Sequence, residues 1–438
     1  MADWLKLIRA DEARRILLDV PPMTTETVSL REAAGRVLAL SLVAPHDLPP
    51  VRLAAMDGYA VRSADVRSAS DEGGVVLQVV GAIPAGTVFA GVLGAGQAVG
   101  IATGGVIPDG ADAVMMVEFT APLESAGGAA GPGARNDVSG RSASRTYVPV
   151  GGAVRVSKMV QPGANVVMPG EDLREGAEIL REGRRLRAGD LAALATFGMV
   201  DVPVYRRPRI AVLATGSEIC PPHEIPRPGQ VRDSNQYVLA AEVEAAGAIA
   251  VPAGIVADDL DVLQSTVLRL VNENDGLILS GGSSVGPKDL TARVLGALEA
   301  PGVLFHGIDI RPGKPTVFAR AGRKPVVGMP GFPTSSMVVF EAFVRPMLAR
   351  LGGEAITELD TWPGSLRARL TRVYSKPASR EDYLRVRLSE HSGEIWADVL
   401  PGGSAAISNV IFADGLARIP AGTERLEEGA SVAVRRFA

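Results

Sequence analysis

The sequence is poor in the residues that build covalent and metal-based centres. Cys220 is the one cysteine among 438 residues, so the chain can form no internal disulfide and no cysteine-ligated zinc or iron–sulfur site. The four histidines stand far apart, and no pair has the spacing of metal ligands: His46, His223, His306 and His391. No Ser–His–Asp triad can be argued from their positions either.

Long apolar runs and a strong net charge are also missing. No run approaches 18 uninterrupted apolar residues, and residues 1–9 carry charges through their apolar positions, unlike a signal peptide. The net charge of −4 gives no general attraction to nucleic acid or acidic membranes. We therefore expect a cytoplasmic protein with neither nucleic acid nor membrane as a partner.

The first half of the chain predicts short helices around a β-rich stretch. Residues 11–18 form one amphipathic helix, and residues 29–40 form a second, in which Ser29 and Glu32 make a capping box. Residues 73–120 are rich in Gly and Val with short alternating runs, which predicts a small all-β module. Residues 124–145 have the Gly, Ala and Ser content of a flexible loop, and a further helix is expected at 190–197.

From residue 209 onward, expected strands and helices alternate. Helices are predicted at 234–246, after 258 or 259, after 287 and at 333–350, with short apolar strands between them. This order predicts a mostly parallel, doubly wound sheet. Residues 356–438 alternate with period two, as in a small β-barrel or sandwich. The fold class is therefore multi-domain α/β, with β-rich modules on either side of a doubly wound domain and an α+β N-terminal module.

The stretch from Asp275 to Asp289 gives the strongest functional signal. A buried strand at 277–279 leads into a loop of glycines and serines and then into a helix, which aims backbone N–H groups at an anion. Lys288 suits a phosphate, and Asp289 suits a metal ion or a helix cap. The spacing matches neither common nucleotide-binding fingerprint, and a tight strand-to-helix turn explains the loop equally well.

Four loops are expected at the carboxyl edge of the sheet, at residues 215–218, 280–289, 310–315 and 328–336. Their Gly, Ser, Lys and Arg residues suit a phosphorylated ligand. Carboxylates that could hold Mg²⁺ against its phosphates are Glu218, Asp258 and Asp289. Asp258 could instead cap a helix, and Arg311 could be a solvated turn residue. These residues predict an anionic, nucleotide-like ligand and leave the reaction open.

Seven short motifs add a family resemblance that covers nearly the whole chain. They occur in the order Ala55-Met-Asp-Gly-Tyr-Ala60, Thr103-Gly with Pro108-Asp-Gly-Ala-Asp112, Gly170-Glu-Asp172, Thr215-Gly-Ser-Glu218, Ser280-Gly-Gly-Ser-Ser-Val-Gly286 with Asp289, Arg311-Pro-Gly-Lys-Pro315 and Gly331-Phe-Pro-Thr-Ser335. Together they resemble the molybdopterin molybdenumtransferase (molybdenum insertase, MoeA) family, which is related to the C-terminal domain of gephyrin. The resemblance implies a transferase that converts adenylylated molybdopterin and molybdate into molybdenum cofactor and AMP, with Mg²⁺.

The resemblance also implies roles for individual residues. Asp57, Glu218, Asp258 and Asp289 would be catalytic, the last three as metal ligands. Family positions and the four loops together give the substrate-binding set Thr103, Asp172, Thr215, Gly216, Ser280, Gly281, Gly282, Ser283, Lys288, Arg311, Lys314, Pro330, Pro333 and Ser404. Arg311 and Lys314 would offset the charge of molybdate. Gly307, where some members have lysine, and the apolar residues 166–169 depart from the family pattern.

Domain boundaries and partners follow from the same resemblance. The expected parts are an elongated module of residues 1–50 and 166–206, a β-rich module of 51–165, an α/β molybdopterin-binding-like domain of 207–354 and a β-barrel module of 355–438. A homodimer is implied, with Asp57 of one chain and Asp289 of the other completing each site. Further implied partners are the molybdopterin adenylyltransferase and apo-molybdoenzymes.

Two other functions remain open. A molybdopterin adenylyltransferase, or a related nucleotide-acting enzyme, would share the α/β domain but lack the motif at 55–60 and the β-rich tail. A non-catalytic scaffold, like part of gephyrin, would have no need of the acidic set. Release of AMP that depends on molybdate would separate the insertase from both.

Overall fold

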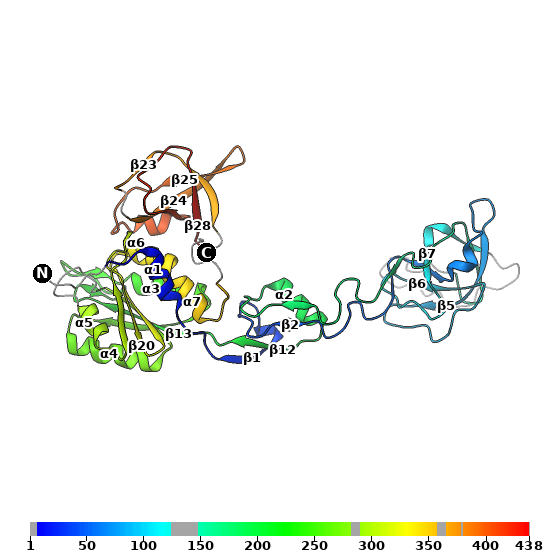
Figure 1. Cartoon of the computed structure of the whole chain (residues 1–438), viewed down its shortest axis with the longest axis horizontal. Helices are drawn as coiled ribbons and strands as arrows, with labels where there is room; N and C mark the ends of the chain where they lie inside the picture. Colours follow the sequence, from blue (N-terminus) through cyan, green and yellow to red (C-terminus); the bar gives the residue numbers. More distant parts are fainter. Residues whose placement is uncertain (1–6, 124–147, 282–289, 357–364, 378–379, 438) are drawn as a thin grey trace. The chain divides into compact units, whose positions relative to one another are not determined.

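The computed structural model describes residues 7–123, 148–281, 290–356, 365–377 and 380–437 (Figure 1). The chain forms two compact units, one of residues Leu42–Ile179 and one of Met1–Ser41 with Leu180–Ala438. In the described ranges, no helix has both the length and the hydropathy needed to span a bilayer.

A six-stranded mixed sheet forms the centre of the larger unit. Its order is β16 (Ile249–Val256), β13 (Arg209–Thr215), β17 (Gly276–Ser280), β21 (Lys324–Met329), β20 (Val317–Ala321) and β18 (Pro301–His306). The first four strands are parallel to one another, β20 runs antiparallel to β21, and β18 runs antiparallel to β20. The antiparallel edge arises because only Gly322 and Arg323 join β20 to β21, and such a short hairpin connection cannot link parallel strands.

Helices cover both faces of this sheet, which confirms the doubly wound α/β prediction (Figure 1). One face packs against α1 (Ala10–Leu18), α3 (Asn235–Ala245), α6 (Pro333–Val339) and α7 (Arg345–Leu351). The other packs against α4 (Leu260–Glu273) and α5 (Leu290–Gly296). Strand side chains alternate accordingly, with Ile210 and Val212 in one core and Ala211 and Leu213 in the other.

The C-terminal residues form a closed barrel, as one of the two sequence alternatives predicted. Its strands are β24 (Glu381–His391), β25 (Glu394–Val399), β22 (Leu366–Leu370), β28 (Ser431–Arg436) and β26 (Gly415–Ile419), and the pairing of β24 with β26 closes the ring. Inward side chains such as Leu370, Val386 and Ala417 are fully buried. A short strand of the α/β domain, β19 (Ile310–Arg311), adds to β24 in parallel.

The N-terminal helix α1 joins the two parts of the larger unit. Ala13 and Leu17 lie in the core beside α7. Arg14 stacks over the Phe343 ring at 5.1 Å, donates to the Tyr383 hydroxyl at 2.6 Å and pairs with Glu381 of the barrel. Helix α1 therefore packs into a core made of residues between Ile210 and Leu416.

The smaller unit contains a second six-stranded sheet, which confirms the predicted all-β module. Its order is β7 (Ala113–Met116), β4 (Gly58–Val61), β6 (Gln97–Ile101), β5 (Val75–Ile83), β9 (Ala153–Val156) and β8 (Thr120–Leu123). Both faces are covered by apolar clusters, around Tyr59 and Leu77 on one side and Val99 and Ile101 on the other. The loop expected at 124–145 lies outside the described residues.

Short elements connect these parts. Two-strand ladders pair β1 (Thr25–Ser29) with β12 (Asp201–Tyr205), β2 (Leu42–Val43) with β11 (Glu178–Leu180), β3 (Leu53–Ala54) with β10 (Val166–Val167), β14 (Ile219–Cys220) with β15 (Val231–Arg232), and β23 (Tyr374–Ser375) with β27 (Arg425–Leu426). The remaining helical elements are α2 (Ala188–Thr196), α8 (Ser408–Phe412), three 3₁₀ turns at Leu30–Glu32, Ser63–Val66 and Val117–Phe119, and a π turn at Phe340–Val344.

The predicted helix at 29–40 is wrong. Its capping box exists, because Glu32 Oε2 accepts from Ser29 N at 3.3 Å and from Ser29 Oγ at 2.7 Å. The box encloses only the 3₁₀ turn, and Gly35 then adopts a left-handed φ of 72°. Val37 and Leu38 go on to form bridges with distant residues, so β-pairing replaces the helix that the local signals favoured.

The helix predicted at 333–350 is present, but a π turn divides it into two α-helical segments. The π turn separates α6 from α7, and Pro346 lies near the start of α7 rather than limiting the helix. Pro346 has no N–H to donate to residue 342, and the wider turn directly before it gives its ring room.

Candidate active site

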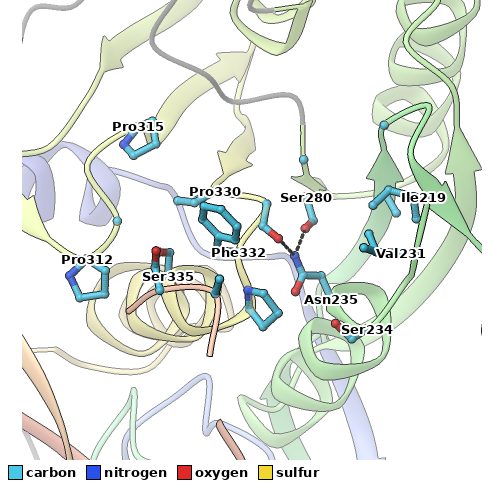
Figure 2. A pocket seen from close by; sticks show the side chains of 18 of the residues that line it. Ile219, Val231, Ser234, Asn235, Ser280, Pro312, Pro315, Pro330, Phe332 and Ser335 are labelled. Atoms are coloured by element: carbon cyan, nitrogen blue, oxygen red, sulfur yellow. Dashed lines mark hydrogen bonds between the residues drawn. The ribbon is translucent and has the colours of Figure 1, made fainter. Parts of the chain in front are cut away.

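A cavity of about 1380 Å³ lies at the carboxyl ends of the parallel strands. Gly216 and Glu218 follow β13, Ser280 ends β17 and Gly281 follows it, and residues 330–333 follow β21. Figure 2 shows Ser280, Pro330 and Phe332 around the cavity. Ser404 and Arg380 of the barrel region complete the wall. The cavity occupies the position where open α/β sheets bind their ligands.

Two carboxylates meet at the loop after β13. Gly216 has a φ of 149°, and a Cβ at this position would come within 2.7 Å of the Glu218 carboxylate, so glycine allows Glu218 to fold back over the turn. Asp258 Oδ2 accepts from Ser217 N at 3.2 Å, and Ser217 Oγ accepts from Asp258 N at 3.1 Å. Glu218, in the loop after β13, and Asp258, in the loop after β16, therefore both line the cavity beside Ser217.

Asp258 does not cap helix α4, so that alternative is wrong. The cap is Asp259, whose Oδ1 accepts from the backbone N–H groups of Asp261 and Val262, both at 3.0 Å. Because Asp259 takes this place, the Asp258 side chain is left to face the loop of Ser217.

Asn235 ties two further loops together, and the sequence did not predict it. Its Nδ2 donates to Ser280 Oγ at 2.7 Å and to the Gly331 carbonyl at 2.8 Å (Figure 2). Gly281 supports the same junction, because its φ is 110° and a Cβ there would lie 2.0 Å from the Thr215 carbonyl oxygen. The one signal that could have identified Asn235 is its position at the start of α3, directly after the polar pair Asp233 and Ser234.

Basic side chains outnumber acidic ones around the cavity. Among the described lining residues, the basic set is Arg232, Arg293, Arg311, Lys314 and Arg380, and the acidic set is Glu218, Asp233 and Asp258. Burial raises the pKa of Asp233 above its ordinary value. The cavity is therefore suited to an anion.

The two predicted cations differ in their partners. Arg311 Nη2 lies 2.6 Å from Asp382 Oδ2, a barrel residue that the sequence did not predict, and this hydrogen bond raises the pKa of Arg311. Lys314 also lines the cavity, and within the described residues its Nζ has no carboxylate at ion-pair distance. Its charge is available to a ligand.

Ten predicted site residues are brought together in this cavity: Gly216, Glu218, Asp258, Ser280, Gly281, Arg311, Lys314, Pro330, Pro333 and Ser404. Thr215 is buried at the end of β13, next to them in the chain. Asp57, Thr103 and Asp172 belong to the other compact unit. Gly282, Ser283, Lys288 and Asp289 lie outside the described residues, so their roles stay predictions.

Asp57 and Thr103 form a local pair within the smaller unit. Asp57 Oδ1 accepts from Thr103 N at 2.7 Å and from Thr103 Oγ1 at 2.8 Å. These hydrogen bonds lower the pKa of Asp57, so the carboxylate stays ionised at neutral pH. Asp172 is exposed in the loop before β11.

The acidic residues of the cavity can be compared with the ligands that Mg²⁺ usually takes in proteins. Among the described residues, no group of three or more His, Cys, Asp or Glu side chains could hold a metal ion. Mg²⁺, however, is usually held by one or two carboxylates together with substrate phosphates and water. Glu218 and Asp258 supply two such carboxylates in the cavity wall, so the residues present fit this ion.

Comparison with known proteins covers the chain in three parts. Residues 8–198 match the sequence model of the MoeA N-terminal region (domain I and II), residues 211–350 that of a probable molybdopterin binding domain, and residues 367–437 that of the MoeA C-terminal region (domain IV).

Relatives that match over most of their length are molybdopterin molybdenumtransferases. A molybdopterin molybdenumtransferase of Bacillus subtilis is 33% identical over 98% of this chain and 93% of its own, and one from Nostoc is 33% identical over 94% and 88%. Among solved structures, a molybdopterin biosynthesis MoeA protein of Pyrococcus horikoshii is 32% identical, with a TM-score of 0.79 over 99% of this chain and 100% of its own.

Proposed function

Because the chain belongs to the MoeA family and is a molybdopterin molybdenumtransferase of molybdenum cofactor biosynthesis, we propose that it inserts molybdate into adenylylated molybdopterin with release of AMP. The observation that carries this proposal is the cavity, which is lined by Glu218 and Asp258 together with Lys314 and Arg311. Both reactants are anionic, and a cavity that combines carboxylates with an excess of basic groups suits phosphates and an oxyanion.

Different side chains of the cavity bind different parts of the reactants. Lys314 and Arg311 attract molybdate and offset its two negative charges. Glu218 and Asp258 would hold Mg²⁺, which when bound neutralises the phosphate oxygens of the anhydride that is broken. Asn235 keeps the loops after β17 and β21 at a fixed separation, so that the donors of Ser280 and Gly281 hold one orientation. Such fixed donors need no rearrangement during the reaction, and no covalent nucleophile is required.

The test is AMP release from adenylylated molybdopterin with and without molybdate. We expect AMP only when molybdate and Mg²⁺ are both present. Release without molybdate, or no release at all, would contradict the proposal; the first is simple hydrolysis and the second is expected of a scaffold. Glu218→Gln should abolish release, whereas Glu224→Gln serves as the control, because Glu224 is exposed and does not line the cavity.

Comparison with the adenylyltransferase alternative favours insertion. An adenylyltransferase would act on molybdopterin and ATP and would need only the α/β domain. In this chain, residues 8–198 and 367–437 also match MoeA regions. A homodimer, a cytoplasmic location, and the molybdopterin adenylyltransferase and apo-molybdoenzymes as partners remain part of the proposal. They rest on the family and on the sequence, and cell fractionation tests the location.

A further inference from the structure

The barrel contributes a strand to the loop that carries Arg311. Strand β24 pairs with β19 in parallel, with Ile310 opposite Glu381 and Arg311 opposite Asp382. Residues separated by 71 positions in the chain are thereby placed side by side. The contact joins the C-terminal barrel to the wall of the cavity, since Arg311 is one of the lining residues.

Asp382 holds one edge of the Arg311 guanidinium. Its Oδ2 accepts from Arg311 Nε at 3.2 Å and from Nη2 at 2.6 Å, and it also accepts from the Tyr374 hydroxyl. The Tyr374 oxygen in turn accepts from Arg311 Nη2 at 3.3 Å. Within the described residues Nη1 forms no hydrogen bond, so two N–H groups of the guanidinium remain available to a ligand.

Burial differs sharply across this pair. The Asp382 side chain is 2% exposed, while the Arg311 side chain is 51% exposed and lines the cavity. A buried carboxylate has few conformations and cannot rotate into water, so it fixes the end of Arg311 that it touches. A guanidinium held in this way loses less conformational entropy when it binds an anion.

A second basic side chain accompanies Arg311 at Asp382. Lys376 Nζ lies 3.6 Å from Asp382 Oδ1, so two basic side chains surround one carboxylate, although burial lowers the pKa of Lys376. Burial, followed by the carboxylate, raises the pKa of Tyr374 to about 12, so this residue stays neutral and donates its proton. Asp382 therefore orients Arg311 while it also faces a second basic side chain.

We propose that Asp382 is a positioning residue for the reaction, which turns the unbonded end of Arg311 toward molybdate or a substrate phosphate in the cavity. This inference rests on the proposed function for the identity of the anion. It makes the C-terminal barrel part of anion binding. The competing role for Asp382 is a purely structural tie between barrel and α/β domain, and the two roles predict different kinetics.

The first test is the substitution Asp382→Asn. We expect the molybdate concentration for half-maximal AMP release to rise about tenfold, with a smaller change in kcat, since a charge-assisted contact is loosened. The matched control is Asp275→Asn. Asp275 holds Arg206 through two hydrogen bonds of 2.8 and 2.9 Å, and neither residue lines the cavity. This control should lower the melting temperature and leave the molybdate dependence unchanged.

A double-variant cycle decides between the two roles. If Asp382 acts through Arg311, Asp382→Asn should change the molybdate dependence less than about twofold in an Arg311→Ala background. Full additivity of the two substitutions, or wild-type molybdate dependence in Asp382→Asn alone, would overturn the proposal.

Two further measurements keep the test informative. If Asp382→Asn does not fold, Tyr374→Phe is the replacement, because it keeps the ring and removes the hydroxyl between Asp382 and Arg311. We expect the molybdate concentration for half-maximal AMP release to rise about threefold. An unchanged molybdate dependence would contradict the proposal. Calorimetric titration with molybdate alone separates this inference from the proposed function. Weakened binding in Asp382→Asn supports positioning even if no AMP is released by the wild type, and equal binding in both rejects it.

Discussion

Asp258 and Asp259 are neighbours in the chain but have different surroundings. Asp258 faces Ser217 and the cavity, and Asp259 caps α4. Asp258→Asn should raise the Mg²⁺ concentration for half-maximal AMP release by about tenfold, since one of two metal-binding carboxylates is lost. Asp259→Asn should be nearly silent, because asparagine caps equally well, and Asp259→Ala should cost about 1 kcal/mol of stability. An Asp258→Asn enzyme with wild-type Mg²⁺ dependence would remove Asp258 from the metal site.

Lys314 is a cavity cation with no carboxylate at ion-pair distance among the described residues. Lys314→Ala should raise the molybdate concentration for half-maximal activity about tenfold, equivalent to roughly 1.4 kcal/mol of lost attraction. Lys324→Ala is the control, because Lys324 Nζ donates to the carbonyls of Val271 and Asn272 at the end of α4, outside the cavity. It should reduce stability only. If both variants keep the wild-type molybdate curve, Lys314 is structural.

The sequence could reveal those site residues that lie next to a strand end. Glu218, Ser280 and Lys314 sit in loops whose glycine and proline content marks them, and the order of elements predicts the edge they share. The sequence could not identify Asn235 and Asp382 as site residues. Their partners lie 45 and 71 residues away in the chain and are brought close only by strand pairing and helix packing. The roles of an aspartate in a cap and in a site also cannot be separated by spacing, as Asp258 and Asp259 demonstrate.

Among the helices and strands, those with a strong repeating pattern were predictable. Leu263, Val267, Leu270 and Val271 recur at helical spacing, and all four are buried in α4. The segment at 29–40 carried a capping signal and apolar residues at helical spacing, but Gly35 adopts a left-handed φ and no helix forms. Because its partners lie some 150 residues later, at Arg185 and Val204, local reasoning could not find the β-bridges that replaced the helix.

Helix α3, the π turn before α7 and strand β28 meet at two carboxylates and two guanidinium groups. Arg345 Nε donates to both Glu341 oxygens at 3.0 Å and pairs with Glu242, and Arg435 Nε lies 3.2 Å from Glu341 Oε2. Burial, followed by the nearby Glu341 carboxylate, raises the pKa of Glu242 from 4.5 to about 7. The folded protein therefore holds this proton more tightly than the unfolded chain does.

A pH dependence of stability follows from that difference. Between pH 4.5 and 7 the folded state binds more protons at Glu242 than the unfolded state does. The contribution of Glu242 to the free energy of unfolding is therefore fully present below pH 4.5 and is lost as pH rises through about 7. Glu242→Gln should flatten this part of the curve and raise stability above pH 7 by roughly 1–3 kcal/mol. Denaturant unfolding at pH 5.5 and 8 measures both. A Glu242→Gln variant that keeps the wild-type pH slope would assign the slope to other groups.

For the molecule as a whole, the family predicts a homodimer. Its mass in solution should be twice 45.5 kDa, measured by light scattering. Asp57 and Glu218 belong to different compact units, which allows a complementation test. If both chains contribute to each site, mixing inactive Asp57→Ala and Glu218→Ala chains should restore roughly a quarter of wild-type activity through mixed dimers. Confirmed subunit exchange without any recovery would assign both residues to one chain.

During synthesis, Arg14 of helix α1 is made 367 residues before its partner Glu381. At typical rates of synthesis this interval lasts roughly 20 to 70 s, during which Ala13 and Leu17 lack the surface that covers them in the finished protein. Residues Leu42–Ile179 form a continuous compact unit and can fold during that time. The cavity, by contrast, is lined by Ser404 and by Arg311, whose strand pairs with β24, so a chain interrupted before residue 404 lacks part of the cavity wall.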